Sequence, residues 1–192
     1  MQYNMFDDLL NSRSEIFDIK NIQDVFLISD THFNHKKIGE YCGRPENWQE
    51  LTIRNWNETV NKNDTVLHFG DFALCSKEDS LKIREQLNGK IYMIKGNHDR
   101  HSVGWYDDIG ITMFKKPFVI DGYNGVPFLF SHAQKPCRTS MINIHGHQHE
   151  KVSFITKWFG NYHINMSVEQ INYRPMKFKE LYKCLHLYIN GI

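Results

Sequence analysis

The stretch that decides the fold runs from residue 90 to residue 99 and reads KIYMIKGNHD. Its first half is an apolar run with the length of a buried strand. Its second half is polar and consists of Gly96, Asn97, His98 and Asp99. A buried strand that stops at such a group delivers polar side chains to the edge of a sheet. The segment therefore predicts a strand whose end carries chemistry.

The same order of elements recurs along the chain. Apolar runs at 25–28, 65–69 and 128–130 lead into Asp30-Thr31-His32, Gly70-Asp71 and Ser131-His132, and the last polar motif is Gly146-His147-Gln148-His149. Segments with helical spacing of apolar residues and further strands are expected between and after these runs. We expect one α/β domain over 1–192, parallel early and mixed or antiparallel late, with 1–20 an extension of unassigned role. The expected helices are 48–60, 77–87 and 177–189, and the later strands are 118–120, 126–130, 142–145, 152–155 and 162–168.

The composition is typical of a soluble globular protein. Of 192 residues, 41% are apolar and 23% are charged, which is enough for one domain with a real core. The 23 basic and 22 acidic residues leave a net charge of +1, so the chain is not a polycation that coats nucleic acid.

The four cysteines form no CxxC pair, which argues against a zinc ribbon. Without a leader peptide or a long apolar run, we expect a cytoplasmic protein with no membrane span.

Carboxylate and imidazole groups stand at the ends of the first two predicted strands. Asp30 and His32 are two positions apart, so both side chains project from the same side and can bind one ion. Asp71 follows a glycine at the next strand end, and its two oxygens allow it to bridge two cations. Oxygen and nitrogen ligands of this kind suit borderline divalent ions. We expect two ions here, with Mn first and Fe, Zn, Co or Ni as alternatives.

The remaining ligand candidates come from later motifs. Asn97 can offer an amide oxygen without adding negative charge, and His132 follows the strand at 128–130. His147 and His149 repeat the alternate-residue spacing on a last loop. By count, one ion is held by Asp30, His32, Asp71 and His149, and the other by Asp71, Asn97, His132 and His147.

Three further residues are expected to act around the ions. Two such ions close together can attack a phosphate ester with water. His98 would lie beside them and either protonate the leaving oxygen or stabilise charge on the phosphoryl group. Asp99 would hold the His98 ring as an orienting carboxylate. Arg44, in a loop near the first motif, is a candidate to neutralise a substrate phosphate, with an ordinary solvated charge as the competing interpretation. His35 either lines the cleft or is a surface residue beside a helix cap.

The ordered series DxH, GD, GNHD, a lone histidine and GHxH, from Asp30 to His149, resembles the calcineurin-like metallophosphoesterase superfamily. Flanking residues are similar to its small single-domain members in bacteria and phages. The resemblance implies two facing mixed β-sheets flanked by helices, a four-layer sandwich, together with a dinuclear centre and the ligand sets given above. Ser131 stands where many relatives have glycine. The flanking matches are Ser29, Phe33, Arg44-Pro45, Trp56-Asn57, Phe72-Ala73 and Asn172-Tyr173-Arg174-Pro175.

These features predict a metal-dependent hydrolase of phosphate esters, in which a hydroxide that bridges the two ions attacks phosphorus in line. The lack of an insertion that could form a cap favours a phosphodiesterase acting on a small or flexible substrate. A phosphomonoesterase or nucleotidase is the first alternative. A nuclease and an inactive scaffold of the same fold are the others; nucleic acid is a possible but not a favoured partner. The sequence leaves the oligomeric state open.

Overall fold

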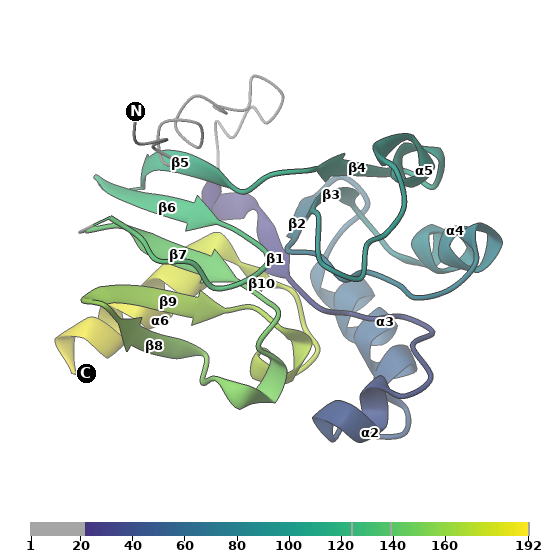
Figure 1. Cartoon of the computed structure of the whole chain (residues 1–192), viewed down its shortest axis with the longest axis horizontal. Coiled ribbons are helices and arrows are strands. Elements are labelled where there is room, and N and C mark those ends of the chain that lie inside the picture. Colours follow the sequence, from purple (N-terminus) through teal and green to yellow (C-terminus); the bar gives the residue numbers. More distant parts are fainter. Residues whose placement is uncertain (1–21, 124, 139, 192) are drawn as a thin grey trace, which may run out of the picture.

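Two five-stranded mixed sheets form the centre of this α/β fold, and helices flank them (Figure 1). The computed structural model describes residues 22–123, 125–138 and 140–191. The segment 1–20 lies outside the described residues. The two-sheet sandwich implied by the family resemblance is therefore confirmed over the described part of the chain.

The first sheet is built from the strands that precede the early polar motifs. Strands β1 (Phe26–Ile28), β2 (Thr65–His68), β3 (Lys90–Ile94) and β4 (Ile111–Phe114) run parallel in that order. Strand β10 (Met176–Lys177) pairs antiparallel with β1 at the edge. Buried parallel strands are expected to be almost continuously apolar, as all three residues of β1 are.

The second sheet has mixed pairing, as predicted for the later half of the chain. Strands β5 (Phe118–Tyr123) and β6 (Val126–Phe130) form an antiparallel pair, and β6, β7 (Ile142–His145) and β9 (Asn161–Asn165) are parallel neighbours. Strand β8 (Ile155–Trp158) closes the sheet antiparallel to β9. The strand predicted at 152–155 was therefore placed three residues too early.

Helices cover both sides of this pair of sheets. In Figure 1, α3, α4 and α5 lie beside the first sheet, and α6 lies behind the second. Contacts of the Phe128 ring with Phe178 and Tyr182 hold α6 against the second sheet. No helix in the described part of the chain is long and apolar enough to cross a membrane. The helices are α2 (Ile38–Cys42), α3 (Trp48–Thr59), α4 (Lys77–Gln86), α5 (Val103–Asp108) and α6 (Phe178–Asn190), with short 3-10 turns η1 (Ile22–Asp24), η2 (His149–Lys151) and η3 (Val168–Gln170).

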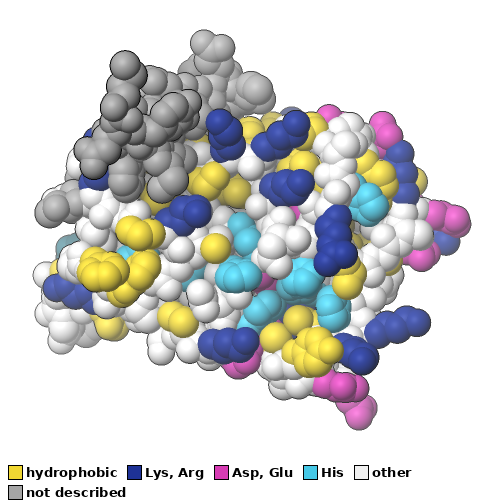
Figure 2. Space-filling view, viewed as in Figure 1, with side chains coloured by type: hydrophobic (Ala, Val, Ile, Leu, Met, Phe, Trp, Pro, Cys, Tyr) yellow, Lys and Arg dark blue, Asp and Glu magenta, His cyan; other side chains and the backbone are white. Residues whose placement is uncertain are grey.

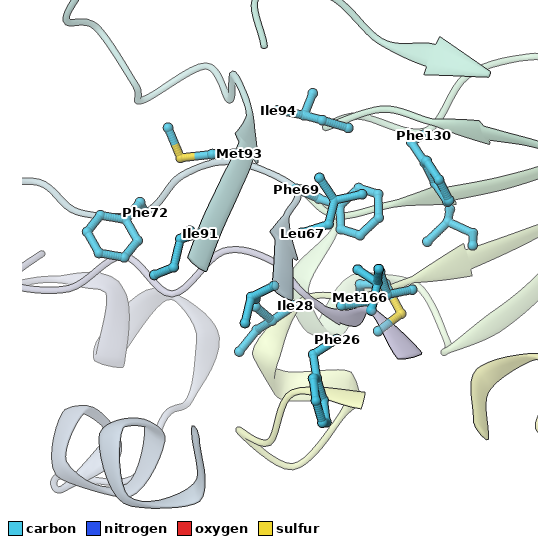
Figure 3. Packing of buried hydrophobic residues seen from close by; sticks show 14 of the residues in the cluster. Phe26, Ile28, Leu67, Phe69, Phe72, Ile91, Met93, Ile94, Phe130 and Met166 are labelled. Carbon is cyan, nitrogen blue, oxygen red and sulfur yellow. The ribbon is translucent and has the colours of Figure 1, made fainter. Parts of the chain in front are cut away.

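The core lies between the two sheets and continues beneath the helices. Phe69, just after β2, packs edge to face on Phe130 at the end of β6, with ring centroids 5.6 Å apart (Figure 3). Both side chains are fully buried. Burying each one contributes roughly 1.5–3 kcal/mol relative to exposure. Because each residue directly precedes a polar motif, this contact also fixes the two strand ends relative to each other.

Candidate metal centre

Five strand ends bring the predicted site residues to one place. Strands β1, β2, β3, β6 and β7 all end at the same edge of the two sheets, which is where open α/β folds carry their sites. An isolated parallel bridge between Ser29 and Ser167 joins the ends of β1 and β9. The structure thus gathers all seven ligand candidates around this junction: Asp30, His32, Asp71, Asn97, His132, His147 and His149.

Five of these seven residues adopt a left-handed backbone conformation, with φ between 48° and 69°. Such a conformation costs a non-glycine residue roughly 1–2 kcal/mol. Strained backbone persists only where the surroundings impose it, and it is concentrated at functional sites. Ligand candidates thus make up five of the ten non-glycine residues with a positive φ in the described part of the chain. The five residues are Asp30, His32, Asp71, His147 and His149.

Asp30 divides its two carboxylate oxygens between the protein and the site. Oδ2 accepts a hydrogen bond from the backbone N–H of His147 at 2.8 Å and lies 3.1 Å from the Ser167 hydroxyl. Oδ1 is buried without a hydrogen-bond partner among the described residues, and it lies 3.9 Å from His32 Nε2 and 3.7 Å from His149 Nε2. Burial alone would raise the pKa of Asp30, but the facing histidines, His132 first, lower it below its usual range.

Asp71 has the geometry of a bridging ligand. Its Oδ1 accepts the backbone N–H of His98 at 2.8 Å, which fixes the carboxylate. Its Oδ2 lies 3.5 Å from His32 Nε2 and also 3.5 Å from His132 Nε2. One oxygen therefore faces both halves of the site. Burial raises the pKa of Asp71 to about 7, and the nearby carboxylates of Asp30 and Asp99 add to the rise.

The second half of the site contains His132, Asn97 and His147. His132 Nδ1 lies 2.7 Å from the carbonyl of Phe69, so this nitrogen carries the hydrogen and Nε2 keeps its lone pair. Nε2 faces the amide oxygen of Asn97 at 2.8 Å. Two acceptors that point at each other favour a cation bound by both. The donor atoms of Asp71, His132 and His147 all lie within 4.8 Å of one another.

The residues present fit divalent cations. The donor atoms of Asp30, His32 and His149 form a second group within 4.8 Å. Besides Asp30 Oδ1, the buried His32 Nε2 has no hydrogen-bond partner among the described residues. Burial lowers the pKa of His32 to about 2, so its ring is neutral and offers a lone pair. Orphaned lone pairs in a buried cluster are the groups that a metal ion would satisfy.

Glu169 is a functional residue that the sequence did not reveal. Its Oε1 lies 3.0 Å from His149 Nδ1, so this carboxylate orients the ring and leaves Nε2 to face the site. Carboxylate–histidine pairs of this kind accompany most metal-binding histidines. The signal is absent from the motifs because Glu169 comes twenty positions after His149, in η3, and only the fold brings η2 and η3 together.

The structure contradicts the prediction that Arg44 holds a substrate phosphate. Its guanidinium is buried and binds Glu169 Oε1 through Nη2 at 2.6 Å and through Nε at 2.8 Å. Nη1 and Nη2 also donate to the carbonyls of Thr31 and Asp30. Each nitrogen of Arg44 is thus already paired inside the protein. Arg44 supports the Asp30 loop from behind instead of meeting a ligand.

The structure also contradicts the prediction that Asp99 orients the His98 ring. Asp99 Oδ2 accepts the backbone N–H groups of Asp71 and Gly96, at 2.7 and 2.8 Å. Oδ1 accepts from the Tyr106 hydroxyl at 3.1 Å and from the Phe72 N–H at 3.2 Å. The buried carboxylate therefore ties the β2 and β3 loops together. Its contribution to the site is to hold the Asp71 backbone in its strained conformation.

His98 and His35 line the approach to the centre. The half-buried His98 ring lies 5.3 Å from the His32 ring and 6.2 Å from the His35 ring. Burial, then the nearby His35 and Arg100, lowers the pKa of His98. The neutral imidazole that results can still donate one N–H to a bound oxyanion. Of the two interpretations of His35, the one that places it beside the cleft agrees with these contacts.

Comparison with known proteins places these features in a family. The sequence profile described as calcineurin-like phosphoesterase matches residues 24–186. An uncharacterized protein of Methanocaldococcus jannaschii is 36% identical over 179 residues, which covers 86% of this chain and 93% of that protein.

Two solved structures are also similar to this chain to different degrees. A protein of unknown function from Aquifex aeolicus superposes with a TM-score of 0.65 at 22% identity, over 83% of this chain and 98% of that one. The Pseudomonas putida nuclease MPE gives a TM-score of 0.46 at 20% identity, over 66% of this chain and 62% of that one.

Proposed function

The chain belongs to the calcineurin-like phosphoesterase family, and from that premise we propose that it is a dinuclear metal-dependent hydrolase of phosphate esters. The observation that carries the proposal is the placement of Asp71 Oδ2, which is 3.5 Å from one histidine of each ligand group. A single carboxylate oxygen that faces two clusters of metal-ligand type supports a pair of cations that share it. We propose Mn as the first choice of metal.

The chain's own residues would bind the substrate and stabilise its charge. Divalent cations held by these residues would polarise the phosphoryl oxygens and acidify a water molecule. His98 projects beside the centre, where its ring N–H can donate to an oxygen of the phosphoryl group. Because its pKa is lowered, we favour stabilisation of developing charge over protonation of the leaving group.

The surface around the centre favours an anionic substrate. Figure 2 shows histidine side chains gathered near the middle of one face, with lysine and arginine side chains around them. Asn97 and His147 are exposed at the mouth of the site, so a substrate reaches it from solvent. An open mouth suits an ester with groups on both sides of phosphorus, and we therefore propose a phosphodiesterase that acts on a small or flexible diester.

We also propose that the protein is cytoplasmic. Its four cysteines are free thiols, which is typical of proteins in a reducing compartment.

Two substitutions test the mechanism. Asp71→Asn keeps the size of the side chain but removes its charge, so we expect loss of Mn-dependent hydrolysis of a bis-aryl phosphate together with loss of bound metal. His98→Ala should keep the metal content and lower kcat by about 10²- to 10⁴-fold. Metal content is measured by elemental analysis after dialysis. An Asp71→Asn protein that hydrolyses the diester at the wild-type rate would show that this centre is not the site of reaction.

A panel of substrates tests the class of ester. We expect kcat/KM for a bis-aryl phosphate to exceed that for a mono-aryl phosphate, since a dianionic monoester needs more positive charge around it than a diester does. Oligonucleotides belong in the same panel, because the lysines and arginines of Figure 2 keep a nuclease as the second candidate. Cleavage of an oligonucleotide that weakens steeply with salt would favour the nuclease. A strong preference for the monoester would instead favour a phosphomonoesterase.

A further inference from the structure

A second cluster of donor atoms shares His149 with the metal centre. Cys42 ends helix α2, Glu150 lies in η2 and Glu169 lies in η3. The Cys42 sulfur, a His149 ring nitrogen and one carboxylate oxygen from each glutamate all lie within 4.8 Å of one another. Three elements that are far apart in sequence thus bring a thiol, an imidazole and two carboxylates together. None of the seven predicted ligands other than His149 belongs to this cluster.

One carboxylate oxygen of Glu169, a member of this cluster, lacks a partner among the described residues. The Glu169 side chain is only 6% exposed, and its Oε1 is fully engaged by Arg44 and by His149 Nδ1. Its Oε2 is buried and has no hydrogen-bond partner among the described residues. A buried carboxylate oxygen without a partner is costly, and a positively charged group would satisfy it. The Arg44 guanidinium cannot supply it, because its nitrogens are committed elsewhere.

We propose that Cys42, His149, Glu150 and Glu169 form a third cation site, selective for a thiophilic divalent ion such as Zn²⁺. Sulfur, imidazole and carboxylate ligands in a group of four match the coordination of zinc in proteins. The thiolate distinguishes this site from the centre around Asp71, where all donors are oxygen or nitrogen, and a hard ion such as Mn²⁺ has little preference for it. On binding, the thiol loses its proton to solvent as the sulfur–metal bond forms.

The shared histidine couples the third site to the proposed catalytic centre. His149 Nδ1 faces Glu169 Oε1 at 3.0 Å, while Nε2 faces Asp30 Oδ1 at 3.7 Å. A zinc ion bound to Nδ1 would take the tautomer whose single ring proton sits on Nε2, so Nε2 would no longer offer a lone pair to an ion in the Asp30 group, and the contact that orients the ring would end. Ligation of the first ion by Nε2 is then weakened. Zinc in the third site therefore inhibits hydrolysis, a consequence that rests on the proposed function, whereas the site itself does not.

Cobalt titration of the full chain tests the site without reference to activity. Co²⁺ bound to a thiolate has an intense near-ultraviolet charge-transfer band, which oxygen and nitrogen ligands do not produce. We expect this band in the wild type and in Cys75→Ser, a control that removes another half-buried free cysteine. We expect its loss in Cys42→Ser. A wild type without the band, or a Cys42→Ser protein that keeps it, would overturn the proposal.

A second variant guards against loss of the band through misfolding. Glu150 is exposed, so Glu150→Gln should not disturb the core. We expect about tenfold weaker cobalt binding, read from the same band, in Glu150→Gln. Unchanged affinity in a Glu150→Gln protein with wild-type Tm would remove Glu150 from the site and contradict the proposed ligand set.

Inhibition of the Mn-loaded enzyme tests the coupling. We expect the Zn²⁺ concentration for half inhibition to be about tenfold higher in Cys42→Ser than in Cys75→Ser. Equal inhibition of the two proteins would overturn the coupling and place the zinc effect at the Asp71 centre. If neither protein hydrolyses any ester with Mn, the proposed function fails, and the cobalt band still decides whether the third site exists.

Discussion

Asp30 and Asp71, the two aspartates of the candidate metal centre, are held by the protein in the same way. Each uses one carboxylate oxygen to accept a backbone N–H, from His147 for Asp30 and from His98 for Asp71. The other oxygen is left facing the histidines. Because the backbone fixes the carboxylate before any ion arrives, little side-chain entropy remains to be lost on binding. Because these carboxylates and histidines can carry protons, the affinity of the site for metal depends on pH.

Metal affinity should rise steeply with pH. Burial raises the pKa of Asp71 to about 7. Burial lowers the pKa of His149, but its contacts with Cys42 and Glu169 outweigh this and raise it to about 10. Below pH 7 both groups hold protons that a cation must displace, so affinity rises by about tenfold per pH unit for each of the two. Between pH 7 and 10 a bound cation displaces a proton from His149 alone. The increase of metal affinity per pH unit, on a logarithmic scale, is therefore half of that below pH 7.

Equilibrium dialysis of Mn²⁺ at several pH values measures how the Mn²⁺ affinity changes with pH. Calorimetry in buffers of different ionisation enthalpy counts the protons that are released on binding. An affinity that is constant between pH 6 and 8 would contradict both raised pKa values. His98→Ala is the matched control, because His98 is not among the ligands and its removal should leave this pH dependence unchanged.

Removing Arg44 should destabilise the protein without a specific effect on substrate binding. Arg44→Met leaves Glu169 and the carbonyls of Asp30 and Thr31 without their donor. Breaking a buried ion pair from one side costs about 3–5 kcal/mol, so we expect a loss of this size in the free energy of unfolding, measured with urea. A stable variant with raised KM would instead restore the role of a phosphate ligand to Arg44. Exposed Arg174, which pairs with Glu58, provides the control, since Arg174→Met should cost no more than about 1 kcal/mol.

Single residues show what sequence reasoning can and cannot reach. The seven ligand candidates could be proposed from the sequence because their type and their place after apolar runs are both visible in the chain. Glu169 and Ser167 were missed because they gain their partners only when η3 folds against Asp30 and His149. The roles of Arg44 and Asp99 were misjudged for the same reason. Charge next to a motif does not say whether the charge faces a ligand or the protein interior.

At the scale of elements, the glycines before the ligand residues serve close approach. A Cβ on Gly146 would stand 1.9 Å from Ser29 Oγ and 2.2 Å from Asp30 Oδ2. On Gly96 it would stand 2.1 Å from Asp71 Oδ1. Neither residue has a positive φ, so a left-handed backbone is not the reason for glycine at these two positions. Glycine is needed there because two loops meet without room for a side chain.

Gly146→Ala should therefore damage both stability and the site. Moving Ser29 and Asp30 aside costs about 1–3 kcal/mol and turns the Asp30 carboxylate away from its position. We expect a lower urea midpoint and weaker Mn²⁺ binding. Gly104→Ala is the control, because Gly104 lies in helix α5 with open space around it, and the change should stabilise by up to about 1 kcal/mol. Equal effects of the two substitutions would contradict the role given to Gly146.

The long helices were predicted well, whereas the short helices and strand β10 were missed. Helices α3, α4 and α6 were predicted to within a few residues, because each repeats its apolar spacing over several turns. Helices α2 and α5, with five and six residues, are too short to show a period, and strand β10 has only two residues. The error at β8 arose because pairing with β9, Ile155 opposite Ile164, sets the register, which no local pattern contains.

At the scale of the whole molecule, both sheets contribute ligands to each proposed ion. Asp30, His32 and Asp71 follow strands of the first sheet, whereas His132, His147 and His149 follow strands of the second. The contact of Phe69 with Phe130 and the bridge from Ser29 to Ser167 join the same two edges. We propose on this basis that the chain behaves as the single domain expected from its sequence, with one cooperative unfolding transition.

Mn²⁺ should stabilise the whole fold. A ligand that binds only the native state adds about 2.7 kcal/mol when its free concentration is a hundred times its Kd. We expect a single calorimetric transition whose Tm rises with Mn²⁺ concentration in the wild type and stays constant in Asp71→Ala. Exposed Asp108 gives the control, since Asp108→Ala should keep the shift. Two outcomes would contradict a metal centre shared by both sheets. One is a wild-type Tm that does not change with Mn²⁺ concentration, and the other is a pair of transitions of which only one shifts with Mn²⁺.

The division of ligands between the sheets also makes the protein a natural subject for fragment complementation. A polypeptide severed between β4 and β5 would carry part of each coordination shell on either piece, and neither fragment alone could complete a shell. Reassociation of the halves would then depend on divalent ions, and recovered phosphoesterase turnover would report their presence.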